Sequence, residues 1–262
     1  MSRVIAITNQ KGGVGKTTTA INLAAALAAS EVKVLLIDTD PQGNSTSGLG
    51  IAKTDGLQTI YQVLVDGSPV QDAICHTETP GLDLLPADKN LIGANLDLVG
   101  SDQRETILAT AIAGIRDQYQ YILIDCPPAL DLLTLNALMA ADAVIIPIQC
   151  EFFALEGVSG LMDTIDRIRD SFGHPLDIEG ILLTMYDERT NLARQVAADL
   201  REFFGSEVFR TVIPRSIRLA EAPSHGKSIL TYDPASKGSE AYIQLAKEVL
   251  ANGQKRSAKS AG

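Results

Sequence analysis

The feature that most constrains the fold of this chain is a glycine-rich segment near its N-terminus. Residues 4–7 (VIAI) precede NQKGGVGKTT at residues 9–18, and an alanine-rich run, TAINLAAALAA, follows. Gly12, Gly13 and Gly15 allow the backbone to bend tightly and to approach a ligand without a side-chain clash. A strand, such a loop and a helix together present backbone N–H groups and a helix N-terminus to phosphate. The segment therefore predicts a phosphate-binding loop within an α/β fold.

The polar residues of this loop predict a bound nucleotide. Lys16 would reach the β- and γ-phosphates, the Thr17 hydroxyl would bind Mg²⁺, and Thr18 would contact the α-phosphate. The usual motif has glycine where this chain has Gln10, and the loop carries an additional lysine, Lys11. The residues expected to bind ATP here are Lys11, Gly12, Gly13, Val14, Gly15, Lys16, Thr17 and Thr18.

Short apolar runs alternate with longer helical patterns along most of the chain. This alternation predicts an α/β fold with a doubly wound, mostly parallel sheet and helices on both of its faces. Several runs, such as VLLID and YILID, are apolar on both faces, which is typical of buried parallel strands. The expected strands are 3–8, 32–38, 82–86, 121–125, 143–148, 178–184 and 208–213, and the expected helices are 16–29, 101–116, 130–141, 155–171, 190–204 and 237–250.

The chain contains no linker that would divide it. Residues 1–250 are therefore predicted to form a single P-loop ATPase domain, and residues 251–262, which are polar and basic, a disordered tail. No apolar run approaches the roughly 18 residues that span a bilayer. Three widely separated cysteines, without disulfide or zinc spacing, suit a reducing cytoplasm.

Acidic residues follow two of the expected strands. Asp38 and Asp40 end the run LLIDTD, and Asp125 ends YILID. In a doubly wound sheet these carboxylates belong at the carboxyl edge, where the phosphate loop also lies. We expect Mg²⁺ to be held by Thr17, Asp38 and Asp125. Because no glutamate follows Asp125, the role of orienting the attacking water falls on Asp40.

The charge of the chain is distributed unevenly. Its net charge is −10, which by itself argues against nucleic acid as a ligand. Residues 1–188 hold 10 Lys and Arg against 25 Asp and Glu, whereas residues 189–262 hold 12 against 7. An acidic protein can still bind a polyanion if its cations gather on one face. The alternative is a solvated surface with a basic tail.

Five segments, KGGVGKTT, LLIDTDPQGN, YILIDCPP, IPIQCEFFALEG and IPRSIRLAEAPSHGKSI, together resemble the ParA/Soj partitioning ATPases. These proteins belong to the ParA/MinD group with a deviant Walker A motif. The resemblance implies a homodimer with ATP sandwiched between subunits, in which Lys11 reaches the nucleotide of the partner. It also implies that hydrolysis needs Asp40 and that Pro214 and Ser216 contribute to the adenine pocket. The family more often has asparagine at the position of Ser216.

The same resemblance implies a function in moving DNA. Arg189 and Arg218 match positions where such ATPases carry DNA-binding arginines, and no sequence-reading motif is visible. The implied protein binds DNA non-specifically in its ATP state and segregates chromosome or plasmid DNA. Its hydrolysis would be weak alone and stimulated by a ParB-type centromere-binding protein. It would be cytoplasmic and associated with the nucleoid.

Other functions of the group remain alternatives. A MinD-like positioning ATPase needs an amphipathic helix for the membrane, but the C-terminal tail has nothing bulky and apolar, so we expect no membrane binding. A nucleotide-gated iron–sulfur protein needs two cysteines that share a cluster, and Cys126 has no obvious partner. A P-loop metabolic enzyme, such as a cobyrinic acid amidase or dethiobiotin synthetase relative, needs a pocket for a small carboxylate.

Overall fold

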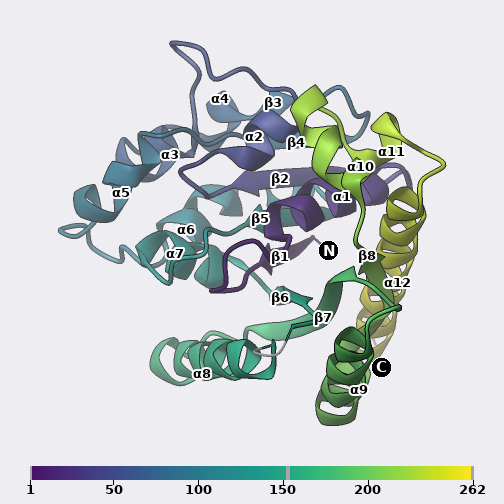
Figure 1. The fold of residues 1–262 in the computed structure, drawn as a ribbon. Helices are drawn as coiled ribbons and strands as arrows, with labels where there is room; N and C mark the ends of the chain where they lie inside the picture. Colours follow the sequence, from purple (N-terminus) through teal and green to yellow (C-terminus); the bar gives the residue numbers. More distant parts are fainter. Residues whose placement is uncertain (1, 152–153, 261–262) are drawn as a thin grey trace.

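The protein is built on one eight-stranded sheet (Figure 1). The computed structural model describes residues 2–151 and 154–260. The strand order is β3-β4-β2-β5-β1-β6-β7-β8, and neighbouring strands are parallel except β3 and β4. The strands are β1 Arg3–Ile7, β2 Val34–Asp38, β3 Cys75–His76, β4 Leu82–Leu85, β5 Tyr121–Asp125, β6 Ala143–Gln149, β7 Asp177–Tyr186 and β8 Val208–Pro214. The expected α/β fold is confirmed. The short edge strand β3 was not predicted.

Helices pack against both faces of the sheet because successive side chains of a strand point to opposite sides. β2 and β5 are buried at every position. One face packs on α1 and α12, and the other on α3 and α5 to α9. The helices are α1 Lys16–Ala28, α2 Asn44–Gly48, α3 Ile60–Val65, α4 Val70–Ala73, α5 Leu91–Asp97, α6 Ile107–Ala113, α7 Leu132–Ala140, α8 Ala154–Phe172, α9 Asn191–Phe204, α10 Ile217–Glu221, α11 Ile229–Tyr232 and α12 Lys237–Ser260.

The strand order places a ligand site beyond the end of β1. β1 pairs with β5 on one side and β6 on the other, and the chain continues from β1 to β2 on the far side of β5. Open α/β sheets bind ligands at such a switch point, outside the carboxyl ends of the strands. The glycine-rich loop follows β1, and the predicted carboxylates follow β2 and β5. The fold therefore gathers them at one edge.

The helix expected over residues 101–116 is shorter in the structure, where α6 begins at Ile107. The side chain of Asn136, on α7, accounts for the difference. Its amide nitrogen donates to the Arg104 carbonyl at 2.7 Å, and its oxygen accepts from the Leu108 backbone nitrogen at 3.1 Å. These bonds hold the chain in a turn ahead of α6.

The expectation of a disordered tail from residue 251 is corrected, because α12 continues to Ser260. Glu179, near the start of β7, explains why this polar segment is ordered: its side chain is only 2% exposed. Arg256 pairs with that carboxylate, and the Asn252 amide donates to it at 3.2 Å. Arg3 contacts the same group at 3.3 Å. A buried carboxylate thus anchors the last turns of the helix, although composition favoured disorder.

Candidate functional site

The glycine-rich loop leaves the first turn of α1 open to an anion. Gly13 and Gly15 have φ of 75° and 89°, a left-handed conformation that residues with a side chain adopt rarely. Gly15 is the N-cap of α1 and provides no side-chain cap for the helix N–H groups. Val14 is buried, and its carbonyl accepts a hydrogen bond from the Thr184 hydroxyl at 2.8 Å. The loop is therefore anchored to β7 while its N–H groups remain available.

A cavity of about 380 Å³ lies directly above this loop. It brings together most of the residues that the sequence predicted for ATP, and those of them that line it are Gly12, Gly13, Gly15, Lys16, Thr17, Thr18, Asp40, Pro214 and Ser216. Val14, Lys11, Asp38 and Asp125 do not line it. Two segments almost 200 residues apart in sequence thus meet at one cavity.

Lys16 is the cation at the base of the cavity. It is 7% exposed, and its ammonium group donates to the Lys11 carbonyl at 3.1 Å. Burial lowers the pKa of Lys16, while the nearby Asp125 raises it. A buried ammonium group that lacks full hydration is strongly stabilised by an anion placed next to it. This position fits a lysine that holds the phosphates of a nucleotide in its own subunit.

Asp38 and Asp125 lie side by side beneath the cavity, at paired positions of β2 and β5. Both are fully buried. Asp38 Oδ2 accepts hydrogen bonds from the backbone N–H and the hydroxyl of Thr46, each at 2.8 Å. Burial raises the pKa of Asp38 to about 6. Burial, and secondarily the charge of Asp38, raises the pKa of Asp125 to about 8.

The surroundings of Asp125 fit a cation. Its Oδ2 accepts from the Ser45 hydroxyl at 2.8 Å, whereas its buried Oδ1 has no hydrogen-bond partner. The Thr17 side chain faces the same carboxylate. Two adjacent carboxylates with raised pKa and an unsatisfied oxygen favour a positive charge beside them. Within the described residues no group of three or more His, Cys, Asp or Glu could hold a metal ion. Mg²⁺ usually binds one or two carboxylates together with water and substrate phosphates, which this pair of aspartates fits.

Asp40 follows β2 and lines the cavity, unlike Asp38. Its Oδ1 accepts from the Gln42 backbone N–H at 2.9 Å, and its carbonyl accepts from Gly43 at 2.8 Å. The aspartate is therefore held in a turn whose side chain faces the space above the loop. A carboxylate in this position can orient a water molecule toward a γ-phosphate.

The second loop lysine has different surroundings from the first. The side chain of Lys11 is 46% exposed, and its Nζ lies 2.6 Å from Oε2 of Glu151, which is 45% exposed. Glu151 follows β6 and was not singled out in the sequence, where nothing pairs it with the loop. Lys11 does not line the cavity, and its half-exposed ammonium group is paired with Glu151 instead.

Further residues of the cavity were not predicted from the sequence. Most are apolar and would suit a base, and the additional lining residues are Asn44, Pro128, Thr184, Met185, Ile213, Leu219, Ala220 and Tyr242. Met185 has a φ of 47°, which is unusual for a residue with a side chain. Thr184 and Met185 lie near the carboxyl end of β7. The rule that ligand sites lie at the carboxyl ends of parallel strands, which predicted the position of Asp38, could therefore have indicated them. Tyr242 comes from α12, and no motif identified it.

The two arginines predicted to bind DNA are exposed but paired with carboxylates. The guanidinium of Arg189, 85% exposed, bonds to Asp187 at 2.7 Å and holds the pKa of that carboxyl down at about 2. Arg218, on α10, contacts Glu221 at 3.0 Å and Asp233 at 3.5 Å. Arg189 borders a hollow of about 840 Å³ together with Arg215 and Lys237, and Arg218 does not line it.

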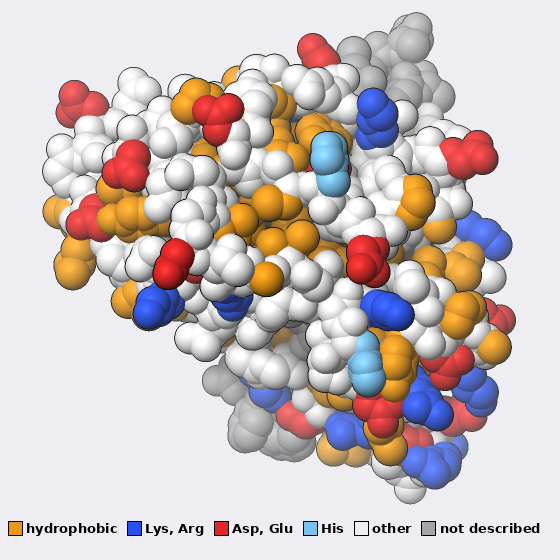
Figure 2. Space-filling view, turned by 90° about the horizontal axis from the view of Figure 1, so that it is seen from above, with side chains coloured by type: hydrophobic (Ala, Val, Ile, Leu, Met, Phe, Trp, Pro, Cys, Tyr) orange, Lys and Arg blue, Asp and Glu red, His pale blue; other side chains and the backbone are white. Residues whose placement is uncertain are grey.

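Figure 2 shows that cations are clustered on the face that is uppermost in Figure 1. Lys and Arg side chains gather toward the lower right of this view, interspersed with Asp and Glu. The left part shows Asp, Glu and hydrophobic side chains and few cations. No helix within the described residues is both long and apolar enough to cross a membrane.

Comparison with known proteins finds relatives that match this chain over nearly its whole length. The AAA domain family matches residues 2–178. The chain is 54% identical to the sporulation initiation inhibitor protein Soj of Bacillus subtilis over 97% of this chain and 100% of Soj. It is 54% identical to the chromosome partitioning protein ParA of Caulobacter vibrioides over 99% and 98% of the two chains.

Among solved structures, cobyrinic acid a,c-diamide synthase of Mycobacterium smegmatis, with a bound ATP analogue and magnesium, superimposes with a TM-score of 0.85. It is 36% identical over 97% of this chain and 96% of that one. Relatives with this fold therefore bind an adenine nucleotide together with magnesium.

Proposed function

The chain belongs to the ParA/Soj family of chromosome-partitioning P-loop ATPases, and we propose that it is an ATP-gated dimer that segregates DNA. In this proposal two subunits sandwich ATP, and the dimer binds DNA non-specifically. ATP hydrolysis releases the DNA, and a ParB-type centromere-binding protein stimulates that hydrolysis. The protein would consequently associate with the nucleoid while it holds ATP.

The observation that carries the proposal is the contrast between the two loop lysines. Lys16 is buried at the base of the cavity, whereas Lys11 lies outside the lining and points to the surface. A bound nucleotide with its metal leaves negative charge at the mouth of the site. Lys11 of a facing subunit can neutralise that charge, which links dimerisation to the presence of the γ-phosphate. It would also stabilise charge that develops in phosphoryl transfer.

The remaining residues have separable roles in hydrolysis. Lys16 and the N–H groups at the start of α1 would bind the phosphates. Thr17, Asp38 and Asp125 would hold Mg²⁺, which neutralises phosphate charge when bound. Asp40 would orient the attacking water. Pro214 and Ser216, with the apolar residues of the cavity, would contact the adenine.

DNA binding would depend on dimerisation because each subunit offers few cationic contacts. Arg189 and Arg218 are exposed. Arg189 would exchange Asp187, and Arg218 would exchange Glu221 and Asp233, for a DNA phosphate. Exposed ion pairs of this kind contribute little free energy, so breaking them to contact DNA costs little. Two subunits in one dimer double the contacts on the same DNA, and the gain in affinity follows from avidity.

The proposal is tested by measuring DNA binding and molecular mass with ATP, with ADP and without nucleotide. We expect dimers, detected by light scattering, and DNA binding only in the presence of ATP. Asp40→Ala, which should block hydrolysis, should make both the dimers and the DNA binding persist. Dimers of equal stability in all three conditions would contradict ATP gating. DNA binding by a monomer would contradict the avidity argument.

A second candidate is a small-molecule amidation enzyme, because a structure at 36% identity bears the name cobyrinic acid a,c-diamide synthase. The two partitioning relatives match at 54% over almost their whole length, which favours the first function. An assay of ATP hydrolysis discriminates between them. Stimulation by DNA with a basic partner favours partitioning, whereas turnover that depends on a small carboxylate favours the enzyme.

A further inference from the structure

Asn9, Gln10 and Lys11, at the front of the phosphate loop, each contact β6 or the chain that follows it (Figure 1). Asn9 is 4% exposed, and its side-chain amide donates to the Pro147 carbonyl of β6 at 2.8 Å. The side-chain amide of Gln10 lies 3.5 Å from the Thr164 hydroxyl on α8. The position of Lys11 therefore depends on β6 and α8 as well as on the loop itself.

Lys11 is held at three of its atoms. Its backbone N–H donates to Asn9 Oδ1 at 2.9 Å, and its carbonyl accepts from Lys16 Nζ at 3.1 Å. Its own ammonium group donates to Glu151 Oε2 at 2.6 Å. A nucleotide would draw Lys16 to its phosphates, and in the proposed dimer Lys11 would leave Glu151 for the nucleotide of the partner. The bond to Asn9 involves neither ammonium group, so it can hold the backbone while the side chain changes its partner.

A turn between β6 and α8 presents the carboxylate of Glu151 to Lys11. The Glu151 backbone N–H donates to the Gln149 carbonyl at 2.8 Å, and the Glu151 carbonyl accepts from the Ala154 N–H at 3.0 Å. Within residues 2–151 and 154–260, Lys11 is the one residue that bonds to this carboxylate. Glu151 does not line the nucleotide cavity. In the separate subunit its carboxylate therefore acts on the nucleotide site through Lys11.

We propose that Glu151 is a positioning residue that holds Lys11 in its own subunit and so opposes dimerisation until the γ-phosphate is present. The proposal rests on the proposed function, because it assumes that Lys11 reaches the nucleotide of a facing subunit. When Lys11 does so, Glu151 loses its cation at an interface that already carries the charge of two nucleotides. One exposed ion pair contributes little, but a two-fold symmetric dimer breaks two of them.

The first test is the dimer dissociation constant, measured by sedimentation at saturating ATP in an Asp40→Ala background, which should block hydrolysis. Glu151→Gln keeps the size of the side chain and removes its charge. It should lower the constant at least about threefold, since two ion pairs no longer have to break. The difference should shrink at high salt, where exposed charges are screened, whereas a role in packing would not depend on salt in this way. The matched control, Glu207→Gln, removes an exposed carboxylate on the turn before β8 and should leave the constant unchanged.

The second test does not require a dimer. It measures, by mass spectrometry of peptides, how fast an amine-acylating reagent modifies Lys11 in the protein without nucleotide. Glu151→Gln should raise the rate for Lys11 at least about twofold, because the ammonium group is no longer paired with a carboxylate. Lys89, an exposed lysine elsewhere, is the internal reference and should be modified at the same rate in both proteins.

The two tests separate this proposal from the proposed function. An unchanged modification rate for Lys11 would overturn the proposal, because Glu151 would not hold Lys11 in the free subunit. A faster rate with an unchanged or higher dimer dissociation constant would also overturn it, since the contact would then be neutral or would support the dimer. Absence of ATP-dependent dimers in the protein with Glu151 intact would overturn the proposed function, and with it the opposition to dimerisation, whatever the modification rate.

Discussion

The two lysines of the phosphate loop show how far single residues can be predicted. The sequence places Lys11 and Lys16 in one loop and indicates that one of them is additional to the usual motif. It does not indicate their burial, because that depends on β6 and β7, which lie more than 120 residues further along the chain. Glu151, the partner of Lys11, follows β6 within the segment IPIQCEFFALEG, but nothing in that segment indicates a contact with the loop.

We predict that Lys11→Ala retains ATP binding and loses the ATP-dependent dimer. Lys16 and the helix N-terminus remain in place to hold the phosphates, whereas the cation for the facing subunit is removed. Affinity for a fluorescent ATP analogue should change less than about threefold, within the range of a screened surface charge. Light scattering should report a monomer with ATP. Lys89→Ala removes an exposed lysine elsewhere and should dimerise normally, and normal dimers of Lys11→Ala would exclude the role.

The buried carboxyl groups of Asp38 and Asp125 should make the stability of the protein depend on pH. Burial raises the pKa of Asp125 in the folded protein to about 8, above the value of 3.8 for an exposed carboxyl of the unfolded chain. The unfolded state binds fewer protons between these values, so stability falls as pH rises through this range. Asp38, with a pKa of about 6, contributes in the same direction at lower pH.

We therefore expect Asp125→Asn to flatten the decline in thermal stability between pH 6 and pH 8, measured without nucleotide and with a chelator. The difference between the midpoints at the two pH values should shrink by at least about 2 °C. Asp117→Asn, at an exposed aspartate, should keep the slope of the unaltered protein. Parallel slopes for Asp125→Asn and the unaltered protein would show that Asp125 is ionised throughout.

At the scale of elements, strands were predicted better than the ends of helices. β2 and β5 are apolar up to their terminal aspartates, so burial on both faces of the sheet follows from their composition. The end of α12 depends instead on Glu179 of β7, and no local pattern connects residue 256 with residue 179. The same limit applies to the apolar part of the cavity, to which α12 contributes Tyr242.

We predict that Arg256→Ala lowers the free energy of unfolding by about 1–2 kcal/mol, the lower part of the roughly 1.5–3 kcal/mol of a hydrogen bond to a charged group, because Arg256 is partly exposed. Glu179 would keep Arg3 but lose the partner that fastens the last turns of α12. Urea unfolding measures the change. The adjacent exposed Lys255→Ala should be neutral. Equal loss in both variants would indicate a general effect on the helix rather than this contact.

For the whole molecule, the relevant property is the separation of charge along the chain. Residues 1–188 are strongly acidic and residues 189–262 are basic. The sequence predicts this imbalance, and the fold brings part of it together because α9 and α12 both pack against β8, while α10 follows β8 in the chain (Figure 1). Which arginines face a common ligand could not be read from the sequence, since Arg189 and Arg218 are paired with different carboxylates.

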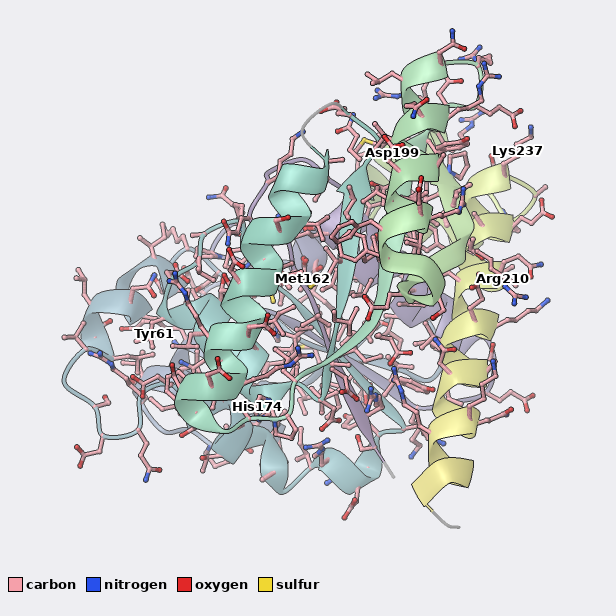
Figure 3. The ribbon with its side chains drawn as sticks, turned by 90° about the horizontal axis from the view of Figure 1, so that it is seen from below. Tyr61, Met162, His174, Asp199, Arg210 and Lys237 are labelled. Atoms are coloured by element: carbon pink, nitrogen blue, oxygen red, sulfur yellow. The ribbon has the colours of Figure 1, made fainter. Side chains whose placement is uncertain are left out.

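We predict that Arg189→Ala and Arg218→Ala weaken ATP-dependent DNA binding and reduce its dependence on salt. Each phosphate contact contributes about 0.9 to the slope of log affinity against log salt on double-stranded DNA. One arginine lost from each subunit removes two contacts per dimer, so each substitution should reduce the slope by about 1.8. Arg210→Ala, on the outer edge labelled in Figure 3, is the matched control and should leave the slope unchanged. An unaltered slope in the double variant, with intact ATP-dependent dimers, would place the DNA on another face of the molecule.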